Sequence, residues 1–470
     1  MSKSCTLDGI DVVADDDNAV SDAGLLLAAT LGDRLGLSAL LSEHLTVPGS
    51  AGANPARKSL TVIHSLLAGG DCIEDVNALR AGSTGAVLGH RVAASSTIGT
   101  FLRAFSFSHA RQLDAVTRQL LARAVTAGAH RGFGESVTVD IDSTLCETYG
   151  LAKDGARGVM RTGLRGYHPL LAVIAGSAAT EQGPGISGVV AHARMRRGRS
   201  SDSTSAPVFI KETISRLRQA GAGGEIVLRA DSGFYLADVV TACRTNDVRF
   251  SITARMIGTA VKDTIAAVAE EDWTPIDYFL PGAGVTEFEL TPFATGPRGK
   301  LLASRGEIHP VRMIVRRTPI TEAQAINRGQ DPDQPELFKV YDYHPMITDR
   351  TGDLVEVEAD HRRHAEVELT IRDLKYDMAM NHFPTKSFGG NAAWLIFNTI
   401  AHNLTRWLTH LGLDTATVMT KKVRRRIYTV TGRLVRTARR LVLRLPRRWP
   451  WADQITTALQ RLRALPSPSG

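Results

Sequence analysis

The sequence predicts an α/β protein in which a mixed β-sheet is flanked by helices. Two observations carry this prediction. Short apolar stretches with the alternating pattern of strands recur from residue 135 onward, and stretches with helical spacing separate the later ones. Such an order is typical of a sheet with helices packed around it. In chain order we expect three strands (137–144, 167–176 and 185–196), a helix (205–221), a strand (225–234), a helix (236–246) and a strand (248–256).

Hydrophobic patterning also divides the chain into segments. The first hundred or so residues have helical spacing, and later stretches with partial alternation are separated by turn-rich sequence. We therefore expect a helical domain before the sheet and a β-rich subdomain inserted into it. The expected divisions are a flexible N-terminus (1–20), a helical N-terminal domain (21–130), the first part of the core (135–258), the β-rich insertion (272–347), the last part of the core (359–412) and a basic C-terminal region (413–470).

Composition favours a polyanionic partner and gives no sign of a membrane or a disulfide framework. The net charge is +8, and residues 421–448 hold many Lys and Arg but no acidic residue. The four cysteines form no CxxC pair, so neither a zinc site nor a set of disulfides is indicated. The apolar runs are too short and too often interrupted to span a bilayer.

Two aspartates lie on one face of the first expected strand. Asp140 and Asp142 are two residues apart, which is the period of a strand. Like charges on one face repel each other, and a bound cation would relieve that repulsion. The alternative is that Asp142 caps a turn together with Ser143 and Thr144.

A third aspartate, Asp231, ends the apolar run 225–230 and precedes a Ser-Gly turn. The carboxyl end of a strand is where sites in α/β proteins are usually built. The alternative for Asp231 is a helix cap. Each aspartate alone leaves both interpretations open.

Residues 361–375 predict a helix with one polar and one apolar face. Glu368 on this helix is placed to complete a metal site while basic neighbours contact phosphates, and the alternative is a solvated face with pairs such as Glu368–Arg372. The residues of the polar face are His361, His364, Glu368 and Lys375. The apolar stripe consists of Val367, Ile371 and Leu374.

Together these stretches resemble the DDE transposases of bacterial insertion sequences, in the branch with a β-rich insertion before the last acid. The family's third acid lies in a Tyr-x2-Arg-x3-Glu-x6-Lys signature, and residues 361–375 keep its spacing with His in place of both Tyr and Arg. The resemblance covers roughly residues 90–410. The other matching pieces are a glycine-rich segment (154–158), Asp-Ser-Thr (142–144), Tyr-His-Pro-Leu (167–170) and Arg-Ala-Asp-Ser-Gly-Phe (229–234).

The resemblance implies a ribonuclease-H-like core that acts on double-stranded DNA, both terminal inverted repeats and target DNA. Asp142, Asp231 and Glu368 would be the catalytic residues and would bind two Mg²⁺ ions, with Mn²⁺ as a substitute. The implied reaction is strand cleavage at the element ends, followed by attack of the freed 3′-OH on target DNA. A dimer on DNA, associated with the nucleoid in the bacterial cytoplasm and without a membrane partner, is also implied.

Further residues are expected to support the site or to contact DNA. Asp140 is expected to tune or orient the site, and Glu366 competes with Glu368 as third acid, although the spacing to Lys375 favours Glu368. An alternative for residues 421–448 is an amphipathic helix with packed leucines and solvated arginines. The expected DNA contacts are His361, Arg362, Arg363, His364, Arg372, Lys375, Arg424, Arg425 and Arg426.

Three other functions stay open at this stage. One is a nuclease or resolvase with the same core but without strand transfer. Another is a DNA-binding derivative that has lost catalysis. A general nucleoid-binding protein would explain the positive charge but not the three acids.

Overall fold

The structure is a computed structural model of the whole chain. It describes all residues except 1–6, 8–9, 159–163, 177–185, 257–258, 277–279, 295–299, 301–303, 307–308, 321–340, 439 and 468–470. Part of the N-terminus expected to be flexible, and part of the expected β-rich insertion, therefore lie outside the described residues.

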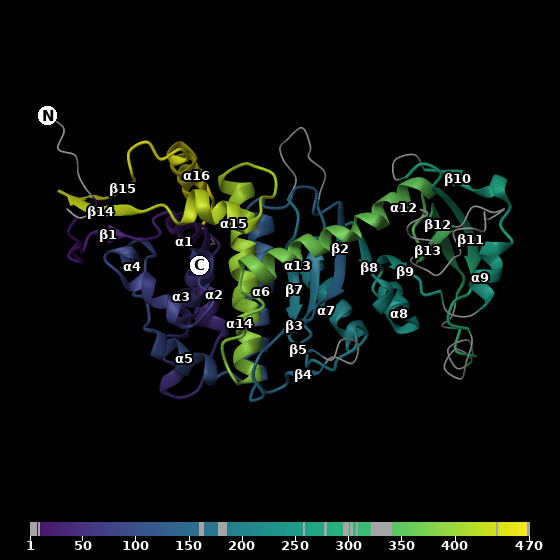
Figure 1. The fold of residues 1–470 in the computed structure, drawn as a ribbon, viewed down its shortest axis with the longest axis horizontal. Helices are drawn as coiled ribbons and strands as arrows, with labels where there is room; N and C mark the ends of the chain where they lie inside the picture. The colour runs from purple at the N-terminus through teal and green to yellow at the C-terminus, as the bar shows by residue number, and fades with distance from the viewer. Residues whose placement is uncertain are drawn as a thin grey trace.

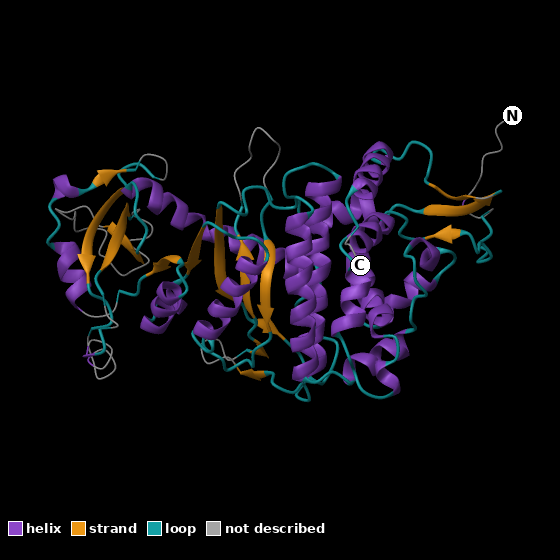
Figure 2. Ribbon diagram, turned by 180° about the vertical axis from the view of Figure 1, so that it is seen from behind, coloured by secondary structure: helices purple, strands orange, loops and turns teal. Residues whose placement is uncertain are grey.

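The centre of the molecule is a mixed sheet, which has nine strands in the described part of the chain (Figures 1 and 2). Its strand order is β10-β11-β12-β13-β9-β8-β2-β6-β7. The middle strands are parallel to one another, and an antiparallel hairpin follows on one side. The strands of this central part are β2 (Ser136–Ser143), β6 (Leu170–Ile174), β7 (Val189–Arg194), β8 (Glu225–Ala230) and β9 (Arg249–Thr253). The mixed α/β class predicted from the sequence is confirmed.

Helices cover both faces of this central part, which explains why its strands are apolar throughout. All five residues of β6 are buried, and the pattern of β2 loses its alternation after Val139 because Asp140 is buried as well. The covering helices are α7 (Ala206–Gln219), α8 (Ala237–Thr245), α13 (Glu366–Asp377) and α14 (Phe388–Trp407).

The strands of the β-rich insertion extend the same sheet. β13 (Tyr341–Thr348) pairs antiparallel with β9, through Met346 opposite Thr253. β12 (Val311–Pro319), β11 (Gly284–Leu290) and the short β10 (Thr274–Pro275) follow outward in that order. The insertion therefore adds strands to the core sheet, where the sequence suggested a subdomain of its own. After β13, α12 (Leu354–Arg362) leads the chain back to the central strands.

The N-terminal segment is helical, as predicted, and packs around α14. Every residue of α14 after Phe388 is buried, because α14 lies between these helices and the sheet. Trp394 and Trp407, at 2% and 0% exposure, are core residues. The helices are α1 (Leu25–Arg34), α2 (Leu37–His44), α3 (Pro55–Ala68), α4 (Thr84–Val87), α5 (Ser95–Arg103) and α6 (Phe107–Thr126).

The basic C-terminal region is not one amphipathic helix. After the short α15 (Thr420–Val423), strands β14 (Gly432–Thr437) and β15 (Arg440–Arg444) form a hairpin, and β1 (Ala19–Val20) pairs with β14. Helix α16 (Ala452–Ala464) then packs against α1.

Among the described helices, no single one is both long and apolar enough to cross a membrane. Only α1 and α2 taken together pass such a test, and the chain bends by 61° between them.

Candidate functional site

Asp142 and Asp231 meet at one edge of the sheet. β2 and β8 are parallel neighbours, and Ile141 lies opposite Ala230 in their register. Each aspartate is the next residue along its own strand, so both carboxylates emerge at the carboxyl ends of adjacent strands. Two aspartates far apart in the sequence are thus brought side by side.

The electrostatics of this edge favour a cation. Burial raises the pKa of Asp142 to about 6, and the negative charge of Asp231 adds to the rise. Burial also raises the pKa of Asp231, although the backbone N–H of Gly233 donates to its Oδ1 at 2.9 Å and opposes this. Carboxylates whose pKa is raised by burial and by neighbouring negative charge are stabilised by a bound positive ion.

A further carboxylate, Asp202, joins this edge and was missed in the sequence. The hydroxyl of Ser143 donates to Asp202 Oδ1, and His168 Nε2 lies 3.5 Å from the same oxygen. A Cβ placed on Gly233 would lie 2.8 Å from Asp202 Oδ2 and 2.9 Å from Asp231 Oδ1. This turn therefore favours glycine, because the carboxylates of Asp202 and Asp231 occupy the space that a side chain at residue 233 would need.

One sequence signal pointed to Asp202. The tripeptide Asp-Ser-Thr occurs at 202–204 as well as at 142–144. The structure fixes the loop through Arg196, whose guanidinium donates to the carbonyls of His168 (2.9 Å), Ser201 (2.8 Å) and Asp202 (3.0 Å). Arg196 thus holds in place the loop that carries Asp202.

The segment 361–375 is not one continuous helix. A 3-10 turn, Arg363–Ala365, separates α12 from α13. Because a 3-10 turn has three residues per turn, His361 and Glu368 do not share one regular helical face. The apolar stripe of Val367, Ile371 and Leu374 is buried, as predicted.

Glu368 lies in the first turn of α13, which packs along β2. His364 Nδ1 is 2.9 Å from Asp140 Oδ1 in β2. Lys375, near the end of α13, lies close enough to Cys146 for its positive charge to oppose the burial that raises the pKa of the Cys146 thiol to about 12. α13 therefore runs along β2 toward its carboxyl end. Glu368 lies on this helix four residues after His364, and its side chain is exposed.

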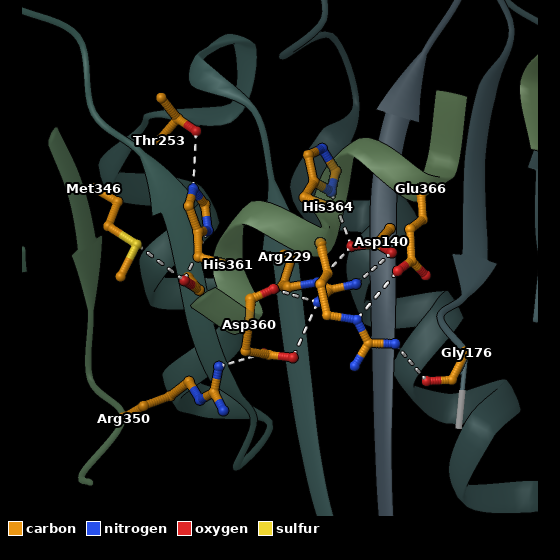
Figure 3. Close-up of polar contacts among 12 residues, drawn as sticks. Asp140, Gly176, Arg229, Thr253, Met346, Arg350, Asp360, His361, His364 and Glu366 are labelled. Carbon is orange, nitrogen blue, oxygen red and sulfur yellow. Dashed lines mark hydrogen bonds and ion pairs between the residues drawn. The ribbon is translucent and has the colours of Figure 1, made fainter. Parts of the chain in front are cut away.

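Glu366 points to the other end of the strands. Its Oε1 accepts from Arg363 at 3.1 Å, and Arg363 also reaches the carbonyl of Gly176, which follows β6 at the end away from Asp142 (Figure 3). Glu366 is therefore engaged at the end of the strands away from Asp142.

The three predicted acids do not form a compact ligand cluster. In the described residues, Asp142, Asp231 and Glu368 do not all place carboxylate oxygens within 4.8 Å of one another.

Comparison with known proteins decides the family. Residues 4–277 and 346–467 match the family described as Transposase DDE domain group 1. The chain belongs to this family. DDE transposases generally use divalent metal ions, in agreement with the oxygen ligands at this edge. The residues between the two matched ranges, 278–345, contain β11, β12 and the start of β13.

The other comparisons add little. The comparison with curated proteins gives no match. Among solved structures, the chain is similar to the piggyBac transposase synaptic complex with hairpin DNA, at 11% identity and a TM-score of 0.42, over 87% of this chain and 80% of that chain.

Asp140 stands apart from the transposase's candidate metal ligands, in a buried ion pair. Arg229 holds it with two hydrogen bonds, Nε to Oδ1 at 2.8 Å and the terminal nitrogen to Oδ2 at 2.9 Å (Figure 3). Burial alone would raise the pKa of Asp140, but the hydrogen bonds from His364 and Arg229 hold it below the usual value. Arg229 also binds the carbonyl of Asp360, so this ion pair ties β2 and β8 to α12 and to the turn before α13.

The expected phosphate contact of His361 does not fit its surroundings. Its Nδ1 lies 2.8 Å from the hydroxyl of Ser251 and its Nε2 lies 3.1 Å from that of Thr253. Burial lowers the pKa of His361 to about 3, so the ring is uncharged at neutral pH. His361 instead fastens α12 to β9. The ring of His364 is likewise engaged within the protein, through its hydrogen bond with Asp140.

Arg424, also expected to contact DNA, is engaged within the protein. Its guanidinium donates to the carbonyls of Leu66 (3.2 Å) and Leu67 (3.1 Å) and to that of Asp377. It therefore joins α15 to the end of α3. The other expected cations have exposed or half-exposed side chains: Arg362, Arg363, Arg372, Lys375, Arg425 and Arg426.

The raised pKa of Asp142 predicts that the site destabilises the metal-free protein. A carboxyl whose pKa rises from 3.8 to about 6 on folding holds its proton more tightly in the folded state. This group therefore opposes folding above about pH 6, and the penalty disappears as pH falls toward 4. In EDTA at pH 7 we expect Asp142→Asn to raise the free energy of unfolding by up to about 3 kcal/mol.

Thermal melts across this pH range test the prediction. The gain from Asp142→Asn should shrink from pH 7 to pH 4. The exposed Glu271→Gln, with the same change of charge, should show no comparable gain. A melting temperature that is unchanged or lower for Asp142→Asn at pH 7 would contradict the electrostatic account.

Proposed function

We propose that this DDE transposase cleaves double-stranded DNA at the ends of an element and joins the freed 3′-OH to target DNA. The observation that carries the proposal is the meeting of Asp142 and Asp231 at the carboxyl ends of adjacent parallel strands, with Glu368 on the helix alongside. The strand order β7-β6-β2-β8-β9 supports the ribonuclease-H-like core that the resemblance implies.

The donor set fits Mg²⁺. Asp142, Asp231 and Glu368 supply carboxylate oxygens, which Mg²⁺ prefers together with water and substrate phosphate. When bound, a pair of such ions would lower the pKa of the attacking water and stabilise the leaving 3′ oxygen. Asp202 adds negative charge at this edge, since it raises the pKa of both aspartates.

The chain's own groups position the DNA and the third acid. The Asp140–Arg229 ion pair and His364 hold the start of α13 against β2, and this fixes where Glu368 lies. Arg372 and Lys375, further along α13, are proposed to contact phosphates near the scissile bond. Because two element ends must be brought together, we also propose that the protein acts as a dimer on DNA.

The test is an assay with a DNA carrying the element ends, a supercoiled target and Mg²⁺. We expect both cleaved ends and joined product. Cleaved ends without joined product would support the alternative of a ribonuclease-H-like nuclease without strand transfer. Binding with neither product, at several divalent ions including Mn²⁺, would indicate an inactive DNA-binding derivative and overturn the proposal.

A further inference from the structure

The β14–β15 hairpin has two different faces. The register places Arg433 opposite Arg444 and Thr437 opposite Arg440, and these residues share one face because strand side chains alternate. On the other face, Leu434 and Leu443 pack against the hydrophobic core. The Val435–Val442 pair lies between the arginines on the first face, and Arg436 and Leu441 on the second face are exposed. The hairpin is therefore a ribbon that is anchored through Leu434 and Leu443 and presents Arg433, Arg440 and Arg444 on its outer face.

The outer face is exposed and largely uncompensated. Arg433, Arg440 and Arg444 all have exposed side chains. Arg433 Nε lies 3.5 Å from Asp16 Oδ2, and in the described part of the chain no carboxylate pairs with Arg440 or Arg444. Like charges directly opposite on paired strands are destabilising, as for Arg433 and Arg444. A polyanion bound to this face would reverse that cost.

The ribbon is held firmly by the rest of the molecule. β1 adds a third strand through Ala19 opposite Arg433, and the backbone N–H of Leu434 donates to the carbonyl of Asn18 at 2.9 Å. A side chain on Gly432 would clash with Ala23, whose Cβ would be 2.7 Å away. Such a support keeps the arginines in a fixed arrangement, which lowers the entropy lost on binding.

A basic groove borders the ribbon. Its volume is about 900 Å³, and Arg57, Arg80 and Arg91 line it without a carboxylate partner among the described residues. The Nε of Arg57 is buried without a hydrogen-bond partner. Ser83, also in the lining, donates its hydroxyl to the carbonyl of Asp17 and its backbone N–H to that of Ala19, which starts β1. The groove therefore lies next to β1, which pairs with β14, and the acidic residues Asp16 and Asp17 lie in the segment between the groove and the ribbon.

We infer that the exposed face of the β14–β15 ribbon docks into a groove of double-stranded DNA, away from the cleavage site. This inference rests on the proposed function, in which duplex DNA is the substrate. The major groove, about 12 Å wide, admits a two-stranded ribbon, and the four steps from Arg433 to Thr437 along the strand span roughly 13 Å. Figure 1 places the ribbon beyond α14 from the central sheet, so it contacts DNA at a distance from Asp142 and Asp231.

The experiment measures the salt dependence of binding by the full chain, in EDTA, to a duplex oligonucleotide and to a single strand of the same length. The variant is Arg433→Ala/Arg440→Ala/Arg444→Ala. Because each neutralised phosphate contributes about 0.9 to the slope of log K against log salt, we expect the slope for duplex to become shallower by about 2–3. The triple lysine variant should restore most of the slope.

The matched control removes the same charge from three exposed arginines off the ribbon. Arg131→Ala/Arg461→Ala/Arg463→Ala should leave the slope unchanged. If the melting temperature of the triple alanine variant is well below that of the parent protein, the single charge reversal Arg444→Glu replaces it. This variant should weaken duplex binding at least about tenfold. A slope equal to that of the control, or an effect confined to single-stranded DNA, would overturn the inference.

The result is separable from that of the proposed function. Binding in EDTA requires no catalysis. If the ribbon variant changes the salt dependence of binding in a protein that does not cleave DNA, the result supports the inference and contradicts the transposition proposal. At low salt, where binding is restored, the ribbon variant should cleave DNA as the parent protein does. Normal cleavage together with an unaltered slope supports transposition and sinks the inference.

Discussion

Replacing Asp142 or Asp231 with Asn is expected to reduce DNA cleavage by at least about 10³-fold. Each change removes a carboxylate from the edge where β2 and β8 end, and stabilisation of phosphodiester transition states by such metal sites is worth several kcal/mol. The measurement is the rate of end cleavage at saturating Mg²⁺. Duplex binding in EDTA should stay within a few fold of the parent protein, because neither side chain belongs to the basic surfaces.

The two glutamates of α13 provide the sharpest control. Glu368→Gln should lose as much activity as the aspartate variants, whereas Glu366→Gln should lose little, since Glu366 pairs with Arg363 at the far end of the strands. The substitutions are chemically identical and two residues apart. If Glu368→Gln keeps full cleavage activity, or if only Glu366→Gln loses activity, then Glu368 is not the third acid of the site.

Replacing Arg229 with Met is expected to destabilise the protein by about 3–5 kcal/mol, the largest effect on folding that the structure suggests. Arg229 and Asp140 are each 1% exposed, so the change leaves a buried carboxylate without its main partner. The control is Arg363→Met, which breaks a pair whose side chains are 47% and 42% exposed and should cost less than about 1 kcal/mol.

The pH dependence of this loss has a definite sign. The pKa of Asp140 is held below 3.8 in the folded protein, so the ion pair stabilises above that pH and its contribution is lost as pH falls through the lowered value. The cost of Arg229→Met, measured by chemical denaturation, should therefore be greatest near neutrality. The double variant Arg229→Met/Asp140→Leu should recover much of the stability, and a cost near that of Arg363→Met would contradict the assignment.

Local patterns were sufficient to predict the strands that carry the aspartates. The apolar runs before Asp142 and Asp231 identify β2 and β8, and the position of an acid at the end of each run already indicates the edge of the sheet. The spacing to Lys375 selected Glu368 over Glu366, and that choice stays a prediction. These features depend on residues close together in the chain.

Features that depend on distant contacts were not predictable. Asp202 lies in a Ser-rich loop, and only folding brings it to Gly233. His361 keeps the spacing of a DNA-contact residue, yet its ring is taken up by Ser251 and Thr253 on a strand far away in the sequence. Pairing of β13 with β9 is equally invisible from local periodicity, and this is why the insertion seemed a separate unit.

The basic hairpin shows a different limit. Short runs such as Leu434–Val435 and Leu441–Leu443 between arginines fit a helix as well as a strand, because few apolar residues are present to show a period. Pairing with β1, from the other end of the chain, decides between the two.

The order in which the acids occur along the chain has a consequence during synthesis. A ribosome makes both aspartates well before it makes the helix that bears the glutamate, and the strands of the insertion emerge in between. Domains fold as their residues become available, so a nascent or prematurely terminated chain can assemble the sheet edge and still lack its third ligand. The complete set of three acids is therefore present only after α13 has been made.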